Sequence, residues 1–232
     1  MKIADPSLPP GQHQIDHFPR FGLTQFANRF PRQVDTTTVN ISGDVQTPAD
    51  IGVAEFARLP RVERRADFHC VTTWTRKDLL WGGVCFRDFF HQLVLPMAGP
   101  SADAGFVVLR GQDGARTSLP LADLLADDVL LADHLNGQPL TIAHGAPLRL
   151  VAPAHYAYKS VKHLDRIEFW HSGAHYRPAG FRFMEHPRAR VAQEERGQWL
   201  PGWLLRTLYR PLIGATAAHF EKALREANRE SA

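Results

Sequence analysis

Short strand-like segments, and not long periodic helices, fill most of this chain and constrain its fold more than any other feature. β-branched and apolar runs typical of strands lie at 37–42, 68–74, 105–110, 129–131, 140–142, 148–151 and 166–170. Helices are predicted at 51–59, 86–94 and 119–125. Because strands and helices do not alternate regularly, the pattern predicts an α+β fold built on a mixed sheet.

Glycine-containing dipeptides divide these segments. Asn136-Gly137 is a strong signal for a β-hairpin, and Asp113-Gly114 indicates a turn. Gly82-Gly83 is expected to break the chain between the strand at 68–74 and the helix at 86–94.

The chain is predicted to form one main domain at 1–186 with a helical extension at 187–232. The chain has 232 residues, of which 44% are hydrophobic, so it can form the core of a large domain. The first 35 residues are rich in Pro, His, Phe and Arg without a clear period. Such a segment is expected to wrap over the domain as an arm. A change of composition near His186 sets the start of the extension.

Two parts of the extension have helical character. The segment 217–228 is predicted to be a helix, with Thr216 as its N-cap. The segment 199–212 is apolar with interspersed arginines. It is expected to dock on the main domain or on an electron-transfer partner, and the alternative is a basic amphipathic helix lying on a membrane surface.

Charge and composition narrow the class of protein. The net charge is only +3, and no basic run is interleaved with aromatic residues, so nucleic acid is not an expected partner. No run approaches the ~18 apolar residues of a membrane span. The N-terminus resembles neither a signal peptide nor a twin-arginine signal, and two cysteines cannot form a disulfide framework. A reducing cytoplasm is therefore the expected compartment.

Cys70 is the candidate for chemistry. It lies in the predicted strand at 68–74, between apolar neighbours. One thiolate cannot hold zinc or an iron–sulfur cluster, which need about four protein ligands. It suffices where an organic cofactor supplies further sulfur ligands to a soft or sulfur-loving metal. The alternative is a buried cysteine that fills the core, which is the expectation for Cys85 between Val84 and Phe86.

A second cluster, downstream, has the character of an anion site. His144-Gly145-Ala146-Pro147 is a turn that leads into a strand carrying Arg149. Lys159-Ser160-Val161-Lys162 then places two cations and a hydroxyl within four residues. An arginine fork and a lysine suit a phosphate, and backbone N–H groups around Ser160 can complete an anion nest. A solvated basic turn is the alternative.

Together these motifs resemble the sulfite-oxidase family of molybdopterin-dependent oxidoreductases, in the family's order along the chain. The cysteine segment 70–74 with 81–84, the stretch 130–140, and the turns at 144–153 and 159–162 carry the resemblance. Pro9-Pro10-Gly11-Gln12 and Phe18-Pro19 are similar to the N-terminal arm of small, haem-free bacterial members.

The resemblance implies a molybdenum–molybdopterin cofactor and a role for each matched residue. Cys70 would be the thiolate ligand of molybdenum. His144 and Arg149 would contact the pterin and its phosphate. Ser160, Val161 and Lys162 would hold the pterin side, and Asp113 falls where the family places a further cofactor contact.

The departures from the family also carry information. Sulfite oxidases follow the cysteine with Gly-Asn-Arg-Arg, where this chain has 72–75, Thr-Thr-Trp-Thr. The position of their catalytic tyrosine falls near Ala115. The chain therefore resembles the branch that includes the protein-methionine-sulfoxide reductase catalytic subunit more than the sulfite oxidases. It lacks a Cys-x-x-Cys-His haem motif, so electrons would pass to or from an external haem or flavin protein.

The implied activity is two-electron oxo transfer with a small or protein-borne substrate, such as an S-oxide, an N-oxide or a methionine-sulfoxide-like group. Two alternatives remain at this point. One is a non-catalytic protein that binds or carries the molybdenum cofactor. The other is a zinc-binding protein, for which His171 and His175 have metal-like spacing, although Gly173 between them argues against a helix.

Overall fold

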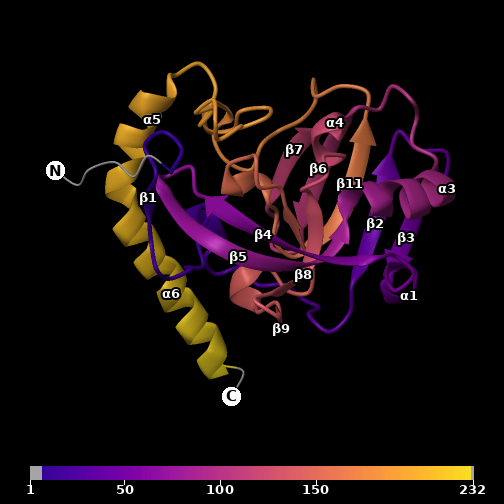
Figure 1. Ribbon diagram of the computed structural model, residues 1–232, viewed down its shortest axis with the longest axis horizontal. Coiled ribbons are helices and arrows are strands. Elements are labelled where there is room, and N and C mark those ends of the chain that lie inside the picture. Colours follow the sequence, from indigo (N-terminus) through magenta and orange to yellow (C-terminus); the bar gives the residue numbers. More distant parts are fainter. Residues whose placement is uncertain (1–6, 231–232) are drawn as a thin grey trace.

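The computed structural model describes residues 7–230 and has two β-sheets joined by short helices (Figure 1). The predicted N-terminal segment before Ser7 lies outside the described residues. One sheet consists of β1 (His13–Gln14), β4 (Arg61–His69), β5 (Trp74–Cys85), β8 (Leu130–Leu135), β9 (Gln138–Pro139) and β10 (Arg149–Val151). The other consists of β2 (Thr38–Gly43), β3 (Ala49–Gly52), β6 (Phe106–Gly111), β7 (Arg116–Pro120) and β11 (Leu164–Trp170).

Both sheets mix parallel and antiparallel pairs. The first has the order β1-β5-β8-β10, with β4 on β5 and β9 on β8, and its β1–β5 pair is parallel. The second has the order β3-β2-β11-β6-β7, and its β2–β11 pair is parallel. The predicted α+β class with mixed sheets is confirmed.

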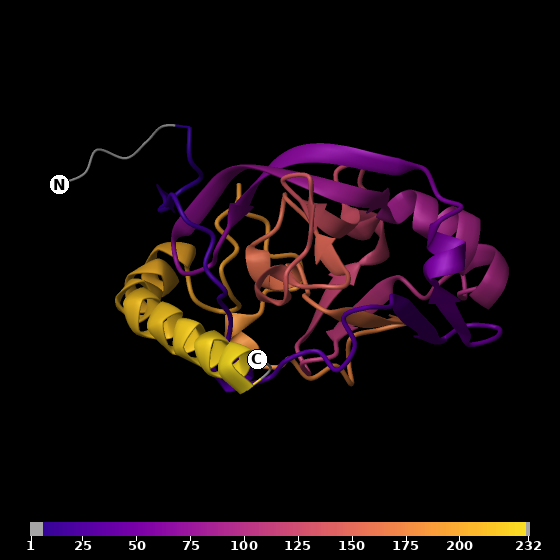
Figure 2. The same cartoon turned by 90° about the horizontal axis from the view of Figure 1, so that it is seen from below.

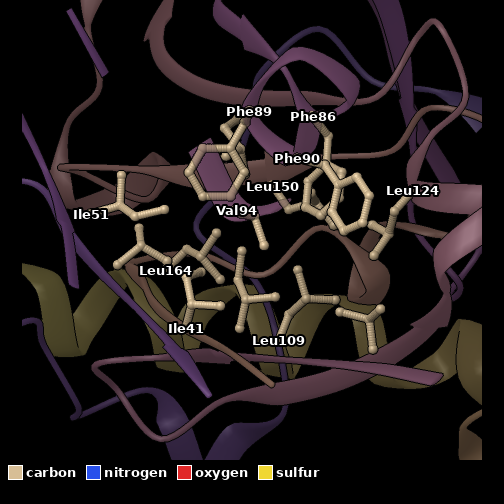
Figure 3. Packing of buried hydrophobic residues seen from close by; sticks show 14 of the residues in the cluster. Ile41, Ile51, Phe86, Phe89, Phe90, Val94, Leu109, Leu124, Leu150 and Leu164 are labelled. Carbon is tan, nitrogen blue, oxygen red and sulfur yellow. The ribbon is translucent and has the colours of Figure 1, made fainter. Parts of the chain in front are cut away.

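One helical segment anchors the larger core. It comprises α2 (Phe86–Phe89), a π turn (Phe90–Val94) and α3 (Leu95–Ala98), so the helix predicted at 86–94 is confirmed and extended. It ends at Gly99, whose φ of 57° is the left-handed conformation of a C-terminal cap. Its apolar residues recur at helical spacing and pack between strands of both sheets, as Figure 3 shows for Phe86, Phe89, Phe90 and Val94.

Several predicted elements are corrected. The segment 68–74 is not one strand, because β4 ends at His69 and β5 begins at Trp74. Gly82-Gly83 does not break the chain but lies inside β5, at a register shift against β8. There the backbone of Leu131 comes so close that a Cβ on Gly83 would meet its carbonyl oxygen at 2.1 Å.

Short segments account for the other differences. Residues 140–142 form no strand; a 3₁₀ turn (Ile142–His144) follows β9. The predicted helices at 51–59 and 119–125 shrink to α1 (Val53–Phe56) and α4 (Leu121–Leu124), each following a strand. Asn136 and Gly137 both adopt positive φ in the β8–β9 turn, which confirms that hairpin.

The two helices of the C-terminal extension lie along the end of the molecule that is farthest from α1 and α3 (Figures 1 and 2). The extension contains α5 (Gly202–Tyr209), a 3₁₀ turn (Arg210–Leu212) and α6 (Ile213–Glu230). Because α6 starts at Ile213, the prediction of Thr216 as its N-cap is wrong. Phe220 and Ala223 of α6 pack on Ala27 of the N-terminal arm. Within residues 7–230, no helix combines the length and apolar character needed to cross a bilayer.

Candidate functional site

Cys70 opens the turn that connects β4 to β5. Its N–H donates to the carbonyl of Trp74 (2.8 Å), and the N–H of Thr73 donates to the carbonyl of Cys70 (3.1 Å). The thiol is buried and lies 3.1 Å from the hydroxyl of Thr72. The turn thus presents the sulfur from the closed end of a hairpin, which fixes its place more firmly than an open loop would.

Cys70 lines a cavity of about 280 Å³. Four separate parts of the chain form most of its walls, and Met184 adds to them. The four parts are the Cys70 turn, the N-terminal arm with Phe18 and Phe21, the segment from His144 to Lys162, and the C-terminal extension with Tyr209. A second cavity of about 170 Å³ shares the wall around Ser160 and Lys162.

All predicted site residues line one or both of these cavities. The first is lined by Cys70, His144, Arg149, Ser160 and Lys162. The second is lined by Asp113, Ser160, Val161 and Lys162. Residues from distant parts of the sequence therefore meet around one continuous region, as expected of a site for a ligand of some length.

Arg149 is a buried cation that forms no ion pair with any carboxylate of residues 7–230. Its guanidinium donates to the carbonyls of His144 (2.8 Å) and Ser160 (3.1 Å). It lies 5.0 Å from the ring centroids of Phe68 and Trp81. Burial lowers its pKa to about 9. The side chain is thus rigidly held, and its charge is left for an anion to neutralise.

The surroundings of Lys162 likewise carry too little negative charge to balance its ammonium group. Its ammonium donates to the carbonyl of Phe21 at 3.3 Å. Burial first, and then the charges of Arg149 and Arg20, lower its pKa to about 7, while Asp113 opposes this shift. An anionic ligand in the shared wall would restore the charged form.

His144 is held as a neutral ring. It ends the 3₁₀ turn before Gly145, whose φ of 111° reverses the chain. Its imidazole stacks on Phe18 with centroids 4.6 Å apart. Burial and the charges of Arg149 and Lys162 lower its pKa to about 4. A neutral ring supplies one donor and one acceptor, which suits a polar heterocycle.

Ser160, Val161 and Asp113 contribute mainly through their backbone and local bonds. The hydroxyl of Ser160 accepts from the N–H of Ala152 (3.2 Å). The N–H groups of Ser160 and Val161 already donate within the 3₁₀ turn, so the expected anion nest is not open there. Asp113 accepts from the N–H of Ala115 (3.0 Å), which fixes the turn between β6 and β7.

Lys159 does not join the site, although it lies in the same motif. It is fully buried and points to Glu185 (3.2 Å) and to the carbonyl of Ser118 (2.7 Å). Its role is structural, and only Lys162 of the two lysines reaches the cavities.

Arg20 is a site residue that the sequence did not reveal. It is 4% exposed, lines the smaller cavity, and donates to the carbonyls of Ala27 (2.6 Å) and Arg29 (2.9 Å). Its Nε is buried and has no hydrogen-bond partner in the described part of the chain. A single arginine in an irregular arm carries no local signal of this kind, because only the fold brings it beside Lys162.

The residues present fit a sulfur-ligated cofactor with an anionic tail. Cys70 lines the larger cavity, and the cations with lowered pKa values line the walls of the two cavities: Arg20, Arg149 and Lys162. The negative charge of Asp113 partly offsets the lowering of the pKa of Arg20 and of Lys162. Burial raises the pKa of Cys70 to about 11, so binding a metal at the sulfur would release a proton.

A zinc site has no support within residues 7–230. No group of three His, Cys, Asp or Glu side chains is arranged there to hold a metal ion. His171 instead pairs at the surface with Asp44 (3.4 Å) and Asp103 (3.0 Å). Cys85 is partly exposed and packs beside the cluster that contains Cys70 and Trp81, so its expected packing role holds in part.

Comparisons with known proteins identify the family. The family model of the oxidoreductase molybdopterin binding domain matches residues 27–175. The uncharacterized oxidoreductase YuiH of Bacillus subtilis (strain 168) is 38% identical over 164 residues, covering 70% of this chain and 78% of YuiH.

Two further relatives are more distant. The protein-methionine-sulfoxide reductase catalytic subunit MsrP of Campylobacter jejuni is 29% identical over 188 residues, covering 67% of this chain and 60% of MsrP. The sulfane dehydrogenase SoxCD of Paracoccus pantotrophus has a similar fold, with a TM-score of 0.50 at 23% identity, over 58% of this chain and 38% of that one.

The family match covers the central part of the site described above, while Arg20 and the C-terminal wall lie outside the matched residues. The family match spans more than half of the chain and includes Cys70, Asp113, His144, Arg149 and Lys162. The chain belongs to the molybdopterin-binding oxidoreductases of the sulfite-oxidase type, and its cofactor is molybdenum–molybdopterin.

Proposed function

We propose that the protein performs two-electron oxo transfer with Cys70 as the protein ligand of molybdenum. The observation that carries the proposal is the convergence of a buried thiol and unpaired cations on adjoining cavities. When bound, the cofactor supplies the two-electron redox chemistry, and the protein provides binding, orientation and electrostatics.

Arg149, Lys162 and Arg20 would hold the anionic tail. Each is a cation whose pKa is lowered by burial, and each donates only to backbone carbonyls among the hydrogen bonds of its charged group. The negative charge of Asp113 would partly offset the repulsion between Lys162 and Arg20. His144, stacked on Phe18, would offer a neutral hydrogen-bonding edge to the pterin.

The apolar lining of the larger cavity suggests a neutral substrate. Phe18, Phe21, Phe68 and Trp74 line it, and they offer apolar surface near Cys70. Once the anionic tail of the cofactor neutralises Arg149 and Lys162, these walls would suit an S-oxide or an N-oxide better than the sulfite anion, whose desolvation they would not repay. The name of the relative MsrP supports a methionine-sulfoxide-like substrate.

The C-terminal extension at 187–232 would act as part of the cofactor-binding unit. Its Tyr209, Leu212 and Thr216 line the cavity of Cys70. The boundary near residue 186 thus marks a change in composition, while the walls of the site cross it.

Electrons would be exchanged with an external redox protein.

The test begins with the purified protein from a host that makes the cofactor. Molybdenum content near one per chain and a Mo(V) signal in electron paramagnetic resonance are expected. Reduced viologen dye would then supply two electrons per S-oxide or N-oxide, with two protons, to give the sulfide or amine and water. Sulfite with an electron acceptor is the comparison substrate. Molybdenum-loaded protein that turns over none of these compounds would refute the proposed activity.

A further inference from the structure

Arg196, in the C-terminal extension, is the most enclosed cation around the Cys70 turn. It is 0% exposed. Its guanidinium donates to the carbonyl of Val71 (2.5 Å), to the carbonyl of Pro10 (2.8 Å) and to the carboxylate of Glu194 (3.2 Å). One face lies 4.9 Å from the ring centroid of Tyr156. A single side chain therefore ties the extension to the N-terminal arm and to the residue after Cys70.

The turn it grips needs outside support. Thr73 adopts φ of 96°, a conformation that a β-branched residue rarely takes. In the backbone, the N–H of Thr73 donates to the carbonyl of Cys70 (3.1 Å), and the carbonyl of Thr73 accepts from the N–H of His13 in the N-terminal arm (2.9 Å). The N-terminal arm adds a second tie, because the amide of buried Gln12 donates to the same carbonyl (3.0 Å) and accepts from the hydroxyl of Thr75 (3.2 Å).

The turn 9–12 of the N-terminal arm packs tightly against Arg196 and its neighbours. Arg206 of α5 pairs with the same carboxylate of Glu194 at 3.0 Å. Gly11 lies against both arginines with φ of 71°, and a Cβ there would meet Arg206 at 2.5 Å and Arg196 at 3.2 Å. The turn 9–12 therefore fits only while Arg196, Glu194 and Arg206 keep their places.

We propose that Arg196 is a positioning residue for Cys70. By holding the carbonyls of Val71 and Pro10 in one planar fork, it would set where the sulfur stands relative to the arm and to the cavity. This role rests on the proposed function, in which Cys70 is the metal ligand. Lysine could neutralise Glu194 but could not reproduce the fork, so charge alone would not replace Arg196.

The experiment compares Arg196→Gln and Arg196→Lys with Arg210→Gln, a control at an exposed arginine of the same extension. Amide hydrogen exchange is measured by mass spectrometry on the peptide that covers residues 68–75. We expect exchange there to be at least tenfold faster in Arg196→Gln, intermediate in Arg196→Lys and unchanged in the control. Peptides from β11 should exchange as in the wild type, because they lie outside the contacts of Arg196.

A second readout tests the consequence for the ligand. In molybdenum-loaded protein, the Mo(V) resonance should change in Arg196→Gln and keep its wild-type form in Arg210→Gln. If Arg196→Gln does not fold, Arg196→Lys gives the same comparison, because lysine keeps a positive charge beside Glu194 without the planar fork. Wild-type exchange at 68–75 together with a wild-type resonance in these variants would overturn the role of Arg196.

The two proposals fail in different ways. If the wild type contains no molybdenum, the proposed function is wrong, and faster exchange in Arg196→Gln would show only that Arg196 holds a structural turn. If the wild type is loaded and the variants match it in both readouts, the function stands and the positioning role is wrong.

Discussion

Arg149 and Lys162 line the same cavity, and the positive charge of Arg149 is among the causes that lower the pKa of Lys162 to about 7. Burial is the larger cause. A buried cation that disfavours the charged form of its neighbour is costly in an empty site and useful in one that holds a phosphate.

The stability of the cofactor-free protein should rise with pH through the range set by Lys162. The ordinary pKa of this group is 10.5, and its value in the fold is about 7. Between these values the unfolded chain binds more protons than the folded one, so unfolding becomes harder as pH increases. Chemical unfolding of the wild type and of Lys162→Met, measured from pH 7 to 10, should show a smaller rise in the variant.

The matched control is Lys222→Met, on the exposed surface of α6, where the pH dependence should equal that of the wild type. Identical pH dependence in Lys162→Met and the wild type would contradict the lowered pKa. Bound cofactor should reduce the effect, because its negative charge favours protonated Lys162.

Arg149→Ala should weaken cofactor retention. Loss of charge-assisted hydrogen bonds from a buried arginine corresponds to about 1.5–3 kcal/mol, which is roughly a tenfold or greater loss of affinity. The ratio of molybdenum to protein after gel filtration measures this loss. Arg225→Ala, on the exposed side of α6, is the control. An unchanged ratio in Arg149→Ala would remove this residue from the cofactor site.

Cys70→Ser should leave a folded protein and abolish or grossly alter turnover, because a hydroxyl does not replace a thiolate as a ligand for a sulfur-loving metal. Turnover with S-oxides and the Mo(V) spectrum are the measurements, and circular dichroism checks the fold. Cys85→Ser is the control. Full activity of Cys70→Ser with the cofactor retained would show that the sulfur is not the ligand.

The comparison of sequence with structure shows which parts local patterns can predict. The helix beginning at Phe86 was predictable because its apolar residues recur at helical spacing. The turn at Cys70 was not, because 68–74 contains no Gly or Pro and Phe68 and Trp74 both pack in one core cluster. An apolar run looks the same whether it is one strand or two strands that meet at a tight turn.

The candidate site divides in the same way. Cys70, His144, Arg149 and Lys162 lie in motifs with a recognisable order, and the structure brings them to the same cavity. The contribution of Arg20 depends on a fold that brings it near Lys162 and Asp113, and that of Arg196 on the distant carbonyls of Val71 and Pro10. Neither has a sequence signature. Lys159 shows the reverse case, since its motif suggested a ligand contact and the fold directs it to Glu185.

Gly83→Ala should destabilise the fold strongly. The added Cβ would lie 2.1 Å from the carbonyl oxygen of Leu131, so β5 and β8 would have to separate. We expect a loss of about 2–3 kcal/mol in the free energy of unfolding, at the upper end of ordinary substitutions. Gly105→Ala is the control, because no atom lies within 4 Å of the position of its Cβ. Urea unfolding of both variants measures the difference, and equal midpoints would contradict the close approach of the two strands.

Phe220→Ala should lower both the stability of the fold and the retention of the cofactor. Phe220 is 1% exposed, stacks on Phe21 with centroids 6.4 Å apart, and lies 5.1 Å from the guanidinium of Arg20. Truncating such a ring costs about 3–5 kcal/mol, and here it also opens a wall of the smaller cavity. The thermal midpoint should fall, and molybdenum should be released faster on dialysis. Leu208→Ala, at an exposed position of α5, should change neither. If Phe220→Ala lowers the midpoint but releases molybdenum at the wild-type rate, α6 supports the fold without closing the cofactor site.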